Sequence, residues 1–275
     1  MITLTGFADE VSFDLGEQIE LLTALGIRHV EFRSAWRTKV LDLTEEQLHE
    51  AKRMLDAAGI ALSSVGSDIG KIQITDPFEE HLERARHAVE VANFFGSPYI
   101  RMFSFFIPEG EDADAYRDEV MRRTRAFVDL AEAGGVTMLH ENEKDIYGDT
   151  AERVVDLITT IDSPNYRAIF DPANYVQCGV RPVDEALPEV RPYTDYIHIK
   201  DAKASDSSVV PAGEGDGQVR ELMRSLHADG YDGFVSIEPH LGEFDAFGGL
   251  CGPDLWTTAY EALTGILTDE GIEWR

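Results

Sequence analysis

The chain has 275 residues, 43% of them hydrophobic, and 52 acidic against 24 basic residues give it a formal net charge of −28. Such a surface repels phosphate backbones and anionic lipid, so no nucleic acid partner is expected. We also expect no membrane span and no signal peptide, because no run of eighteen apolar residues occurs and the first twenty residues lack a basic start.

Short apolar runs, typical of strands, alternate with amphipathic stretches along the whole chain. The predicted strands cover residues 2–7, 29–33, 60–65, 99–103, 136–141, 166–171, 196–200 and 233–238. The predicted helices cover residues 15–26, 44–59, 76–96, 115–133, 183–190, 219–228 and 254–267, with one more starting at 149–152. Residues 44–47 have the form of a capping box, and Pro77 is expected in the first position of its helix.

Eight strand–helix units of this kind predict the fold class. Strands that alternate with helices pair in parallel with the helices outside, and eight units in about 250 residues are the size of a closed barrel. We therefore predict an α/β protein, a single (β/α)8 TIM barrel, with residues 1–275 in one domain. An open doubly wound sheet is the alternative, but no glycine-rich phosphate turn follows the first strand.

Four predicted strands end in residues that do not belong in a core. Glu141, Asp171, His198 and Glu238 are spaced by 30, 27 and 40 residues, about one unit each. Active sites of such barrels lie at these strand ends, so the side chains should converge. Three bare carboxylates would raise one another's pKa, and a divalent cation resolves the repulsion. We expect one metal ion, Mn²⁺ first, with Mg²⁺, Co²⁺ or Zn²⁺ as alternatives.

At these residues the sequence resembles the xylose isomerase-like TIM-barrel superfamily, the sugar phosphate isomerase/epimerase group. The matching segments are residues 139–142, 170–174, 197–201 and 235–238, together with the glycine-containing loop 213–217. The resemblance implies a sugar or polyol substrate and the ligand set Glu141, Asp171, His198 and Glu238. It also implies that Glu141 and Glu238 are catalytic and exchange a proton. Two positions depart from epimerase relatives: Asn174 replaces a histidine, and Glu214 stands where some members have arginine.

The expected activity is a metal-dependent isomerase or epimerase of a small sugar or sugar derivative. The metal would acidify a C–H bond beside a chelated carbonyl, and proton return through an enediolate would give either product. Loss of a β-hydroxyl from the same species would make the chain a dehydratase of the inosose or dehydroshikimate type. A non-catalytic sugar-binding barrel stays open, whereas an AP endonuclease conflicts with the charge and the single histidine ligand.

Several further residues are candidates for reading the substrate. Glu31 and Arg33 share one strand face near the mouth, with a mutual ion pair as the alternative. Lys200 is expected to hold a hydroxyl, a carboxylate or Glu238, with a salt bridge to Asp201 as the alternative. The remaining candidates are Asn174, Glu214 and His240.

Trp36 and Phe103 would form an apolar wall for a sugar, although core packing is favoured. His140 and Asn142 should face the helices, because they alternate with Glu141. Two cysteines, Cys178 and Cys251, are too few for a disulfide framework. We therefore expect a cytoplasmic protein, compatible with a homo-oligomer.

Overall fold

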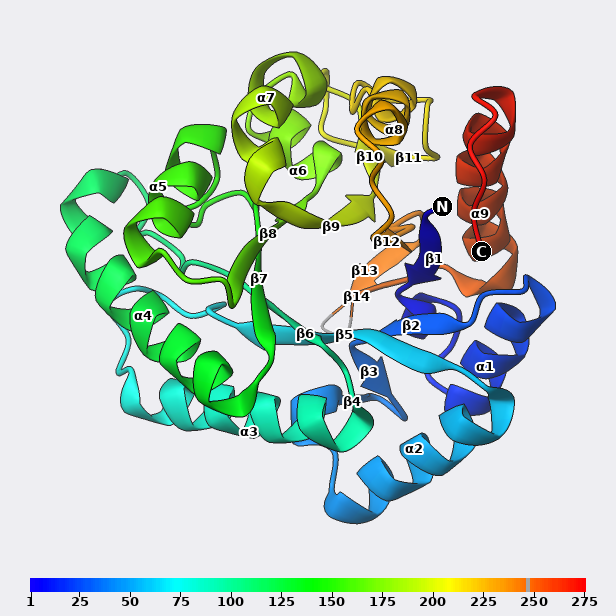
Figure 1. The fold of residues 1–275 in the computed structure, drawn as a ribbon, viewed down its shortest axis with the longest axis horizontal. Helices are drawn as coiled ribbons and strands as arrows, with labels where there is room; N and C mark the ends of the chain where they lie inside the picture. The colour runs from blue at the N-terminus through cyan, green and yellow to red at the C-terminus, as the bar shows by residue number, and fades with distance from the viewer. Residues whose placement is uncertain (246–247) are drawn as a thin grey trace.

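The computed structural model describes residues 1–245 and 248–275. Eight parallel strands pair in the order β1-β12-β9-β8-β7-β6-β5-β2. β2 and β1 are the two ends of this order and lie side by side, so the sheet curls into a nearly closed barrel (Figure 1). The predicted (β/α)8 TIM barrel is confirmed. The barrel strands are β1 Thr3–Gly6, β2 His29–Phe32, β5 Ala61–Ile69, β6 Tyr99–Met102, β7 Thr137–Glu141, β8 Tyr166–Phe170, β9 Thr194–Ile199 and β12 Phe234–Ile237.

Helices surround the barrel between successive strands (Figure 1). The longer ones are α1 Leu15–Ala24, α2 Glu45–Ala58, α3 Glu79–Phe95, α4 Arg117–Gly134, α5 Ala151–Ile161, α8 Val219–Ala228 and α9 Gly252–Asp269. The predicted capping box holds, since Thr44 accepts from Gln47 N and the Gln47 side chain accepts from Thr44 N. The prediction for Pro77 is wrong, because α3 begins two residues later, at Glu79.

Shorter elements fill the connections. The helix predicted at 183–190 is broken into a π-helical turn and one α-helical turn, with Pro188 in the second. Within the described residues, no helix has the length and apolarity needed to cross a membrane. The shorter elements are η1 Ala8–Glu10, β3 Ser34–Ala35, β4 Thr38–Lys39, η2 Val40–Asp42, η3 Ala113–Tyr116, α6 Pro172–Gln177, η4 Pro182–Ala186, α7 Leu187–Val190, η5 Arg191–Tyr193, β10 Asp201–Ala202, β11 Val209–Val210, β13 Glu243–Asp245 and β14 Gly248–Leu250.

The barrel interior changes character along its axis. Leu139, Ile169 and Tyr196 are fully buried and form an apolar cluster inside the barrel, further from the mouth than the strand ends. Above it, the Tyr196 hydroxyl, Ser63 Oγ and Thr5 Oγ1 form a chain of hydrogen bonds, each 2.8 Å long. Because side chains alternate along a strand, the next inward positions lie at the C-terminal end of the barrel. The apolar cluster and these hydrogen-bonded side chains therefore close the barrel beneath its mouth.

β5 is longer than the sequence pattern predicts and runs to Ile69 instead of residue 65. Its pairing with β6 shifts register between Val65 and Ile69, and the Ser67 hydroxyl hydrogen-bonds to Arg101 O. This extension carries the chain past the rim of the barrel. Ser67 and Lys71 consequently line the mouth.

Candidate metal centre

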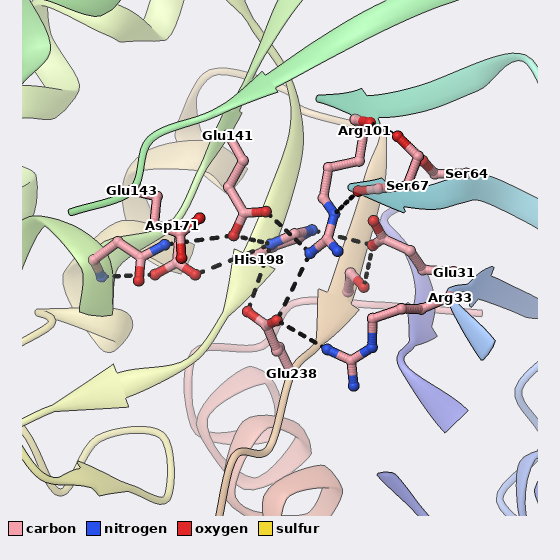
Figure 2. A network of polar contacts seen from close by, with 12 residues as sticks. Glu31, Arg33, Ser64, Ser67, Arg101, Glu141, Glu143, Asp171, His198 and Glu238 are labelled. Carbon is pink, nitrogen blue, oxygen red and sulfur yellow. Dashed lines mark hydrogen bonds and ion pairs between the residues drawn. The ribbon is translucent and has the colours of Figure 1, made fainter. Parts of the chain in front are cut away.

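Four buried side chains converge at the barrel mouth (Figure 2). Each offers one ligand atom, and these atoms all lie within 4.8 Å of one another. They come from the ends of β7 and β9 and from the residues directly after β8 and β12. Strand ends brought into register by parallel pairing explain the convergence. The four residues are Glu141, Asp171, His198 and Glu238.

The His198 ring is oriented by a carboxylate outside this group. Nε2 lies 3.1 Å from Oε2 of Glu31, which also accepts a hydrogen bond of 2.8 Å from the Ser236 hydroxyl. Nδ1 therefore faces the other three donors and lies 3.1 Å from Glu141 Oε1. A carboxylate that holds one ring nitrogen while the other faces the donor cluster is typical of histidine ligands.

Asp171 is fixed by backbone contacts. It caps α6, since its Oδ1 accepts a hydrogen bond of 2.9 Å from Asn174 N. The Asn142 side chain bonds to both the N–H and the C=O of Asp171, at 2.9 and 3.0 Å. Asn174 Nδ2 in turn donates to Asn142 O at 2.8 Å. Asn142 and Asn174 thus hold the end of β8 next to β7.

Three cations compensate the carboxylates: Lys200 and Arg101 are buried, and Arg33 is partly buried. Lys200 Nζ lies 2.9 Å from Asp171 Oδ2 and 3.0 Å from Glu238 Oε2. Arg101 Nη1 lies 3.1 Å from Glu141 and 3.9 Å from Glu238. Arg33 Nη1 is 3.7 Å from Glu238, while its other nitrogens bind Asp9 and Glu10. Without such partners, buried carboxylates would not stay ionised.

The proton affinities of the cluster diverge strongly. Burial raises the pKa of Asp171 to about 6, although Lys200 acts against it. Burial also acts on Glu141, but the charges of His198 and Arg101 outweigh it and bring that pKa to about 2. Burial lowers the pKa of His198, yet Glu141 and Glu31 outweigh it and raise that pKa well above its ordinary value. The imidazole is therefore protonated at neutral pH when the carboxylates are its only partners.

The donor set fits one divalent cation. It offers three carboxylate oxygens and one imidazole nitrogen inside a sphere small enough for a single ion. Oxygen-rich sets with one imidazole suit Mn²⁺ or Mg²⁺, and Zn²⁺ or Co²⁺ are also compatible. A bound cation would replace the protons now held by His198 and, near its pKa, by Asp171. The residues present could therefore hold the ion.

Most of the residues predicted to read the substrate lie around this cluster. Glu31 and Arg33 point inward, but not toward each other, so the alternative of a mutual ion pair is wrong. Lys200 binds Asp171 and Glu238, and the alternative salt bridge with Asp201 is wrong. The reason is that Asp201 instead accepts hydrogen bonds from the N–H groups of Gly213, Gly215 and Gly217.

Of the two remaining candidates, His240 lies at the barrel mouth and Glu214 lies away from it. His240 lies 2.7 Å from Glu10 and 3.7 Å from Glu238, at the edge of the cluster. Glu214 is exposed and lines a separate surface hollow of about 860 Å³ beside α9. The structure does not bring Glu214 to the mouth, because its loop folds back onto Asp201. That larger hollow contains none of the four converging donors.

Residues outside the sequence-based predictions complete the site. Arg101 on β6 was not predicted, although its alternation with Phe103, directly after that strand, placed it on the inward face. Phe103 is fully buried and packs between Arg101 and Lys71, whereas Trp36 is half-buried against the core. His140 bonds to Ser104 Oγ, away from the mouth. Asn142 faces the end of β8 and not the helices, which corrects that prediction.

The mouth encloses a cavity of about 250 Å³. Pockets for drug-sized ligands occupy roughly 300–1,000 Å³, so this one suits a single small molecule. Glu141 and Glu238 line it together with Arg33, Arg101, Lys200 and His240. Two of the proposed metal ligands, Glu141 and Glu238, are thus reachable by a compound of monosaccharide size.

Comparison with known proteins defines the class of protein. The sequence profile of the xylose isomerase-like TIM barrel family matches residues 19–258. This chain belongs to that family.

Two relatives of this chain are named as enzymes. The 3-dehydroshikimate dehydratase of Bacillus anthracis is 23% identical over 222 residues, covering 74% of this chain and 78% of the relative. The 2-epi-5-epi-valiolone 7-phosphate 2-epimerase of Actinoplanes sp. is 29% identical over 180 residues, 64% of either chain. The crystal structure of the IOLI protein with a binding zinc atom superposes with a TM-score of 0.78 at 16% identity, covering 98% of this chain and 99% of that one. At that identity the superposition shows the fold alone.

Proposed function

We propose that this chain is a metal-dependent isomerase or epimerase of a small sugar or sugar derivative. The observation that carries the proposal is the convergence of four buried donors within 4.8 Å of one another at the barrel mouth. Two of them, Glu141 and Glu238, also line a cavity that a small molecule can enter. The epimerase relative supports the same reaction type.

The ligand set proposed is Glu141, Asp171, His198 and Glu238, with Mn²⁺ as the preferred ion. A bound divalent ion supplies a Lewis acid that acidifies the C–H bond next to a chelated carbonyl, an effect of several kcal/mol. The orientation of His198 by Glu31 would keep Nδ1 directed at that ion. The unpaired thiols Cys178 and Cys251 support a cytoplasmic location.

The proton transfer is assigned to the two glutamates. Glu141 is ionised at neutral pH, since its pKa is about 2, and it can accept a proton at Oε1 or Oε2. Lys200, the largest of its favourable charges, keeps the pKa of Glu238 well below the usual range despite burial. Arg101 Nη1 lies between the two carboxylates, so one guanidinium stabilises whichever of them is charged. Positioned proton transfer of this kind contributes about 10²- to 10⁴-fold.

Proton return decides the product. Return to the opposite face of the same carbon gives an epimer, and return to the neighbouring carbon gives an isomer. Arg33, Asn174, Lys200 and His240 surround the two glutamates and are proposed to orient the substrate. Glu31 is proposed to act through His198 rather than on the substrate.

A dehydratase is the second candidate. The dehydratase from Bacillus anthracis matches three quarters of this chain, over 222 residues. Removal of the same proton followed by loss of a β-hydroxyl would give that outcome with the same residues. Only the fate of the hydroxyl separates the two reactions.

Proton NMR in deuterated buffer tests both candidates. The protein is loaded with Mn²⁺, Mg²⁺ or Co²⁺ and offered ketoses, inososes and their acids. An isomerase or epimerase exchanges one C–H for deuterium without losing water, whereas a dehydratase gives a dehydrated enol or ketone. If calorimetry showed that a compound binds the metal-loaded protein but no compound of the panel were turned over, the proposal would be wrong and the chain would be a non-catalytic sugar-binding barrel.

A further inference from the structure

The cavity at the mouth is lined by more basic than acidic residues, although the chain as a whole is strongly acidic. The whole protein has 24 basic and 52 acidic residues. The residues that line the cavity include six lysines and arginines but four aspartates and glutamates. A strongly acidic protein therefore gathers a quarter of its basic side chains around one small cavity. Because basic side chains outnumber acidic ones in its lining, the cavity favours ligands of negative charge.

Three of these cations form a row with two aromatic rings between them. Arg33 Cζ lies 4.6 Å from the centroid of Phe7, and Arg101 Cζ lies 4.9 Å from the same centroid. Arg101 Cζ is also 5.1 Å from the centroid of Phe103, and Lys71 Nζ is 4.2 Å from it. Cations over ring faces are attracted by the ring quadrupole, so the row is held in place. Figure 2 shows Arg33 and Arg101 extending toward the proposed metal ligands.

The counter-charges of this row are of two kinds. Arg33 is satisfied by Asp9 and Glu10, which do not line the cavity. Arg101 relies on Glu141 and Glu238, two of the proposed metal ligands. A divalent ion on those carboxylates would take up their charge and leave Arg101 in surplus.

Lys71 is the outermost member of the row. It pairs with Glu143 at 2.8 Å, and both side chains are about one third exposed. Such a partly exposed pair is worth little, so an incoming anion can displace Glu143 from Lys71. Arg101, in contrast, is held by Ser67 O through Nε. The row therefore combines a fixed guanidinium near the donors with an adaptable ammonium at the rim.

We propose that the substrate carries an anionic group, a carboxylate or a phosphate, which binds to Arg101 and Lys71 beside the metal-chelated end. This inference rests on the proposed function, and it narrows the substrate class from sugars in general to sugar acids or sugar phosphates. Charge-assisted hydrogen bonds to two cations would discriminate against a neutral sugar of the same size.

Matched probes test the inference by binding, without turnover. Isothermal titration of the Mn²⁺-loaded protein compares glucose with glucuronate and glucose 6-phosphate, and glycerol with glycerate and glycerol 3-phosphate. We expect at least one acid to bind about tenfold or more tightly than its neutral partner, because hydrogen bonds to charged groups are worth roughly 1.5–3 kcal/mol. The carboxylate and phosphate members show which of the two anions is preferred.

Variants assign the preference to the row. Lys71→Met should reduce it about tenfold, and Lys71→Arg should keep it, because a hydrogen bond to a charged group is lost in one and retained in the other. Lys144→Met removes one positive charge from an exposed side chain outside the cavity and should change nothing. If the acids showed no gain over the neutral probes, including the case in which no probe bound, the inference would be overturned. It would also be overturned if Lys71→Met kept the preference intact.

The same titrations separate this inference from the proposed function. The metal stoichiometry is measured before any probe is added. A protein that binds no divalent ion overturns the proposed function and the inference with it. A protein that binds one ion but prefers neutral probes overturns the inference alone.

Discussion

Glu31 and His198 are 167 residues apart in the sequence, yet Glu31 Oε2 lies 3.1 Å from His198 Nε2 inside the barrel. Both side chains are fully buried, so this contact is shielded from water. It fixes the ring with Nδ1 toward Glu141, Asp171 and Glu238. A residue of β2 therefore determines how a residue of β9 meets the other donors.

Glu31→Gln should weaken Mn²⁺ binding about 10- to 100-fold, because outer carboxylates of histidine ligands contribute that much to metal affinity. The amide of the variant cannot supply the negative charge, and its N–H₂ can approach Nε2 and favour the wrong tautomer. Competition with a chelating indicator measures the affinity. Glu143→Gln is the matched control, since Glu143 lines the same cavity but is outside the donor group. Equal affinities for both variants would contradict the role of Glu31.

Metal binding should release protons, and more of them at low pH. The raised pKa of His198 means that it is protonated at pH 7.5 and must lose one proton to the ion. Asp171, with a pKa of about 6, is ionised at pH 7.5 but mostly protonated at pH 5. We expect about one proton per ion at pH 7.5 and about two at pH 5, with affinity falling as the pH falls.

Calorimetric titration in buffers of different ionisation enthalpy counts these protons. The number of protons released is decisive, because a site made of ionised carboxylates and a neutral imidazole would release none at either pH. A constant affinity between pH 5 and 7.5 would show that neither His198 nor Asp171 loses a proton when the ion binds.

The convergence of the four donors could be predicted from the sequence because it depends on two regular spacings, the alternation of side chains along a strand and the length of one strand–helix unit. Alternation along a strand gives the inward positions, and one unit of chain brings each strand end to the same height. Glu141 and Glu238 satisfy both conditions, and so does His198. The same reasoning could have found Arg101 on β6, two residues before Phe103, but a single arginine in a strand carries no distinctive spacing.

Other parts of the site depend on tertiary structure that local patterns do not specify. Asp9 and Glu10 reach Arg33 only because β1 and β2 become neighbours when the barrel closes. Lys71 reaches the mouth only because β5 continues past a register shift. The prediction that Glu214 reads the substrate failed for a similar reason. Its loop folds onto Asp201 through backbone hydrogen bonds, and the spacing of residues in the sequence does not indicate such bonds.

Lys200→Met should destabilise the metal-free protein more than the metal-loaded one. Lys200 is buried and lies within 3.0 Å of both Asp171 and Glu238. Removing one partner of a buried ion pair typically costs about 3–5 kcal/mol, because the remaining charge stays buried. A bound Mn²⁺ would supply the missing positive charge, so the ion should restore most of the loss.

Thermal unfolding with and without Mn²⁺ measures both effects of Lys200→Met. Lys52→Met is the control, because Lys52 pairs with Asp56 on the exposed face of α2 and should contribute little. If Mn²⁺ stabilised the Lys200 variant no more than the wild type, the ammonium and the ion would not share the same carboxylates.

Gly215→Ala should destabilise the protein although the glycine lies in a surface loop. A Cβ at this position would lie 2.3 Å from Asp201 Oδ1 and 2.6 Å from Ala202 O, so the loop has to move away. The movement would break hydrogen bonds that the buried Asp201 accepts from three backbone N–H groups. Overpacking of this kind costs typically about 1–3 kcal/mol.

Gly265→Ala is the matched substitution for that loop variant. Gly265 lies inside α9, and an added Cβ would meet nothing within 4 Å. Alanine in a helix interior is favoured over glycine by roughly 0.5–1 kcal/mol, so this variant should be slightly more stable than the wild type. If Asp201 organises the loop, chemical denaturation should show a lower free energy of unfolding for Gly215→Ala and a higher one for Gly265→Ala than for the wild type. Unchanged stability of Gly215→Ala would mean that the three hydrogen bonds to Asp201 can be lost or rearranged at no cost.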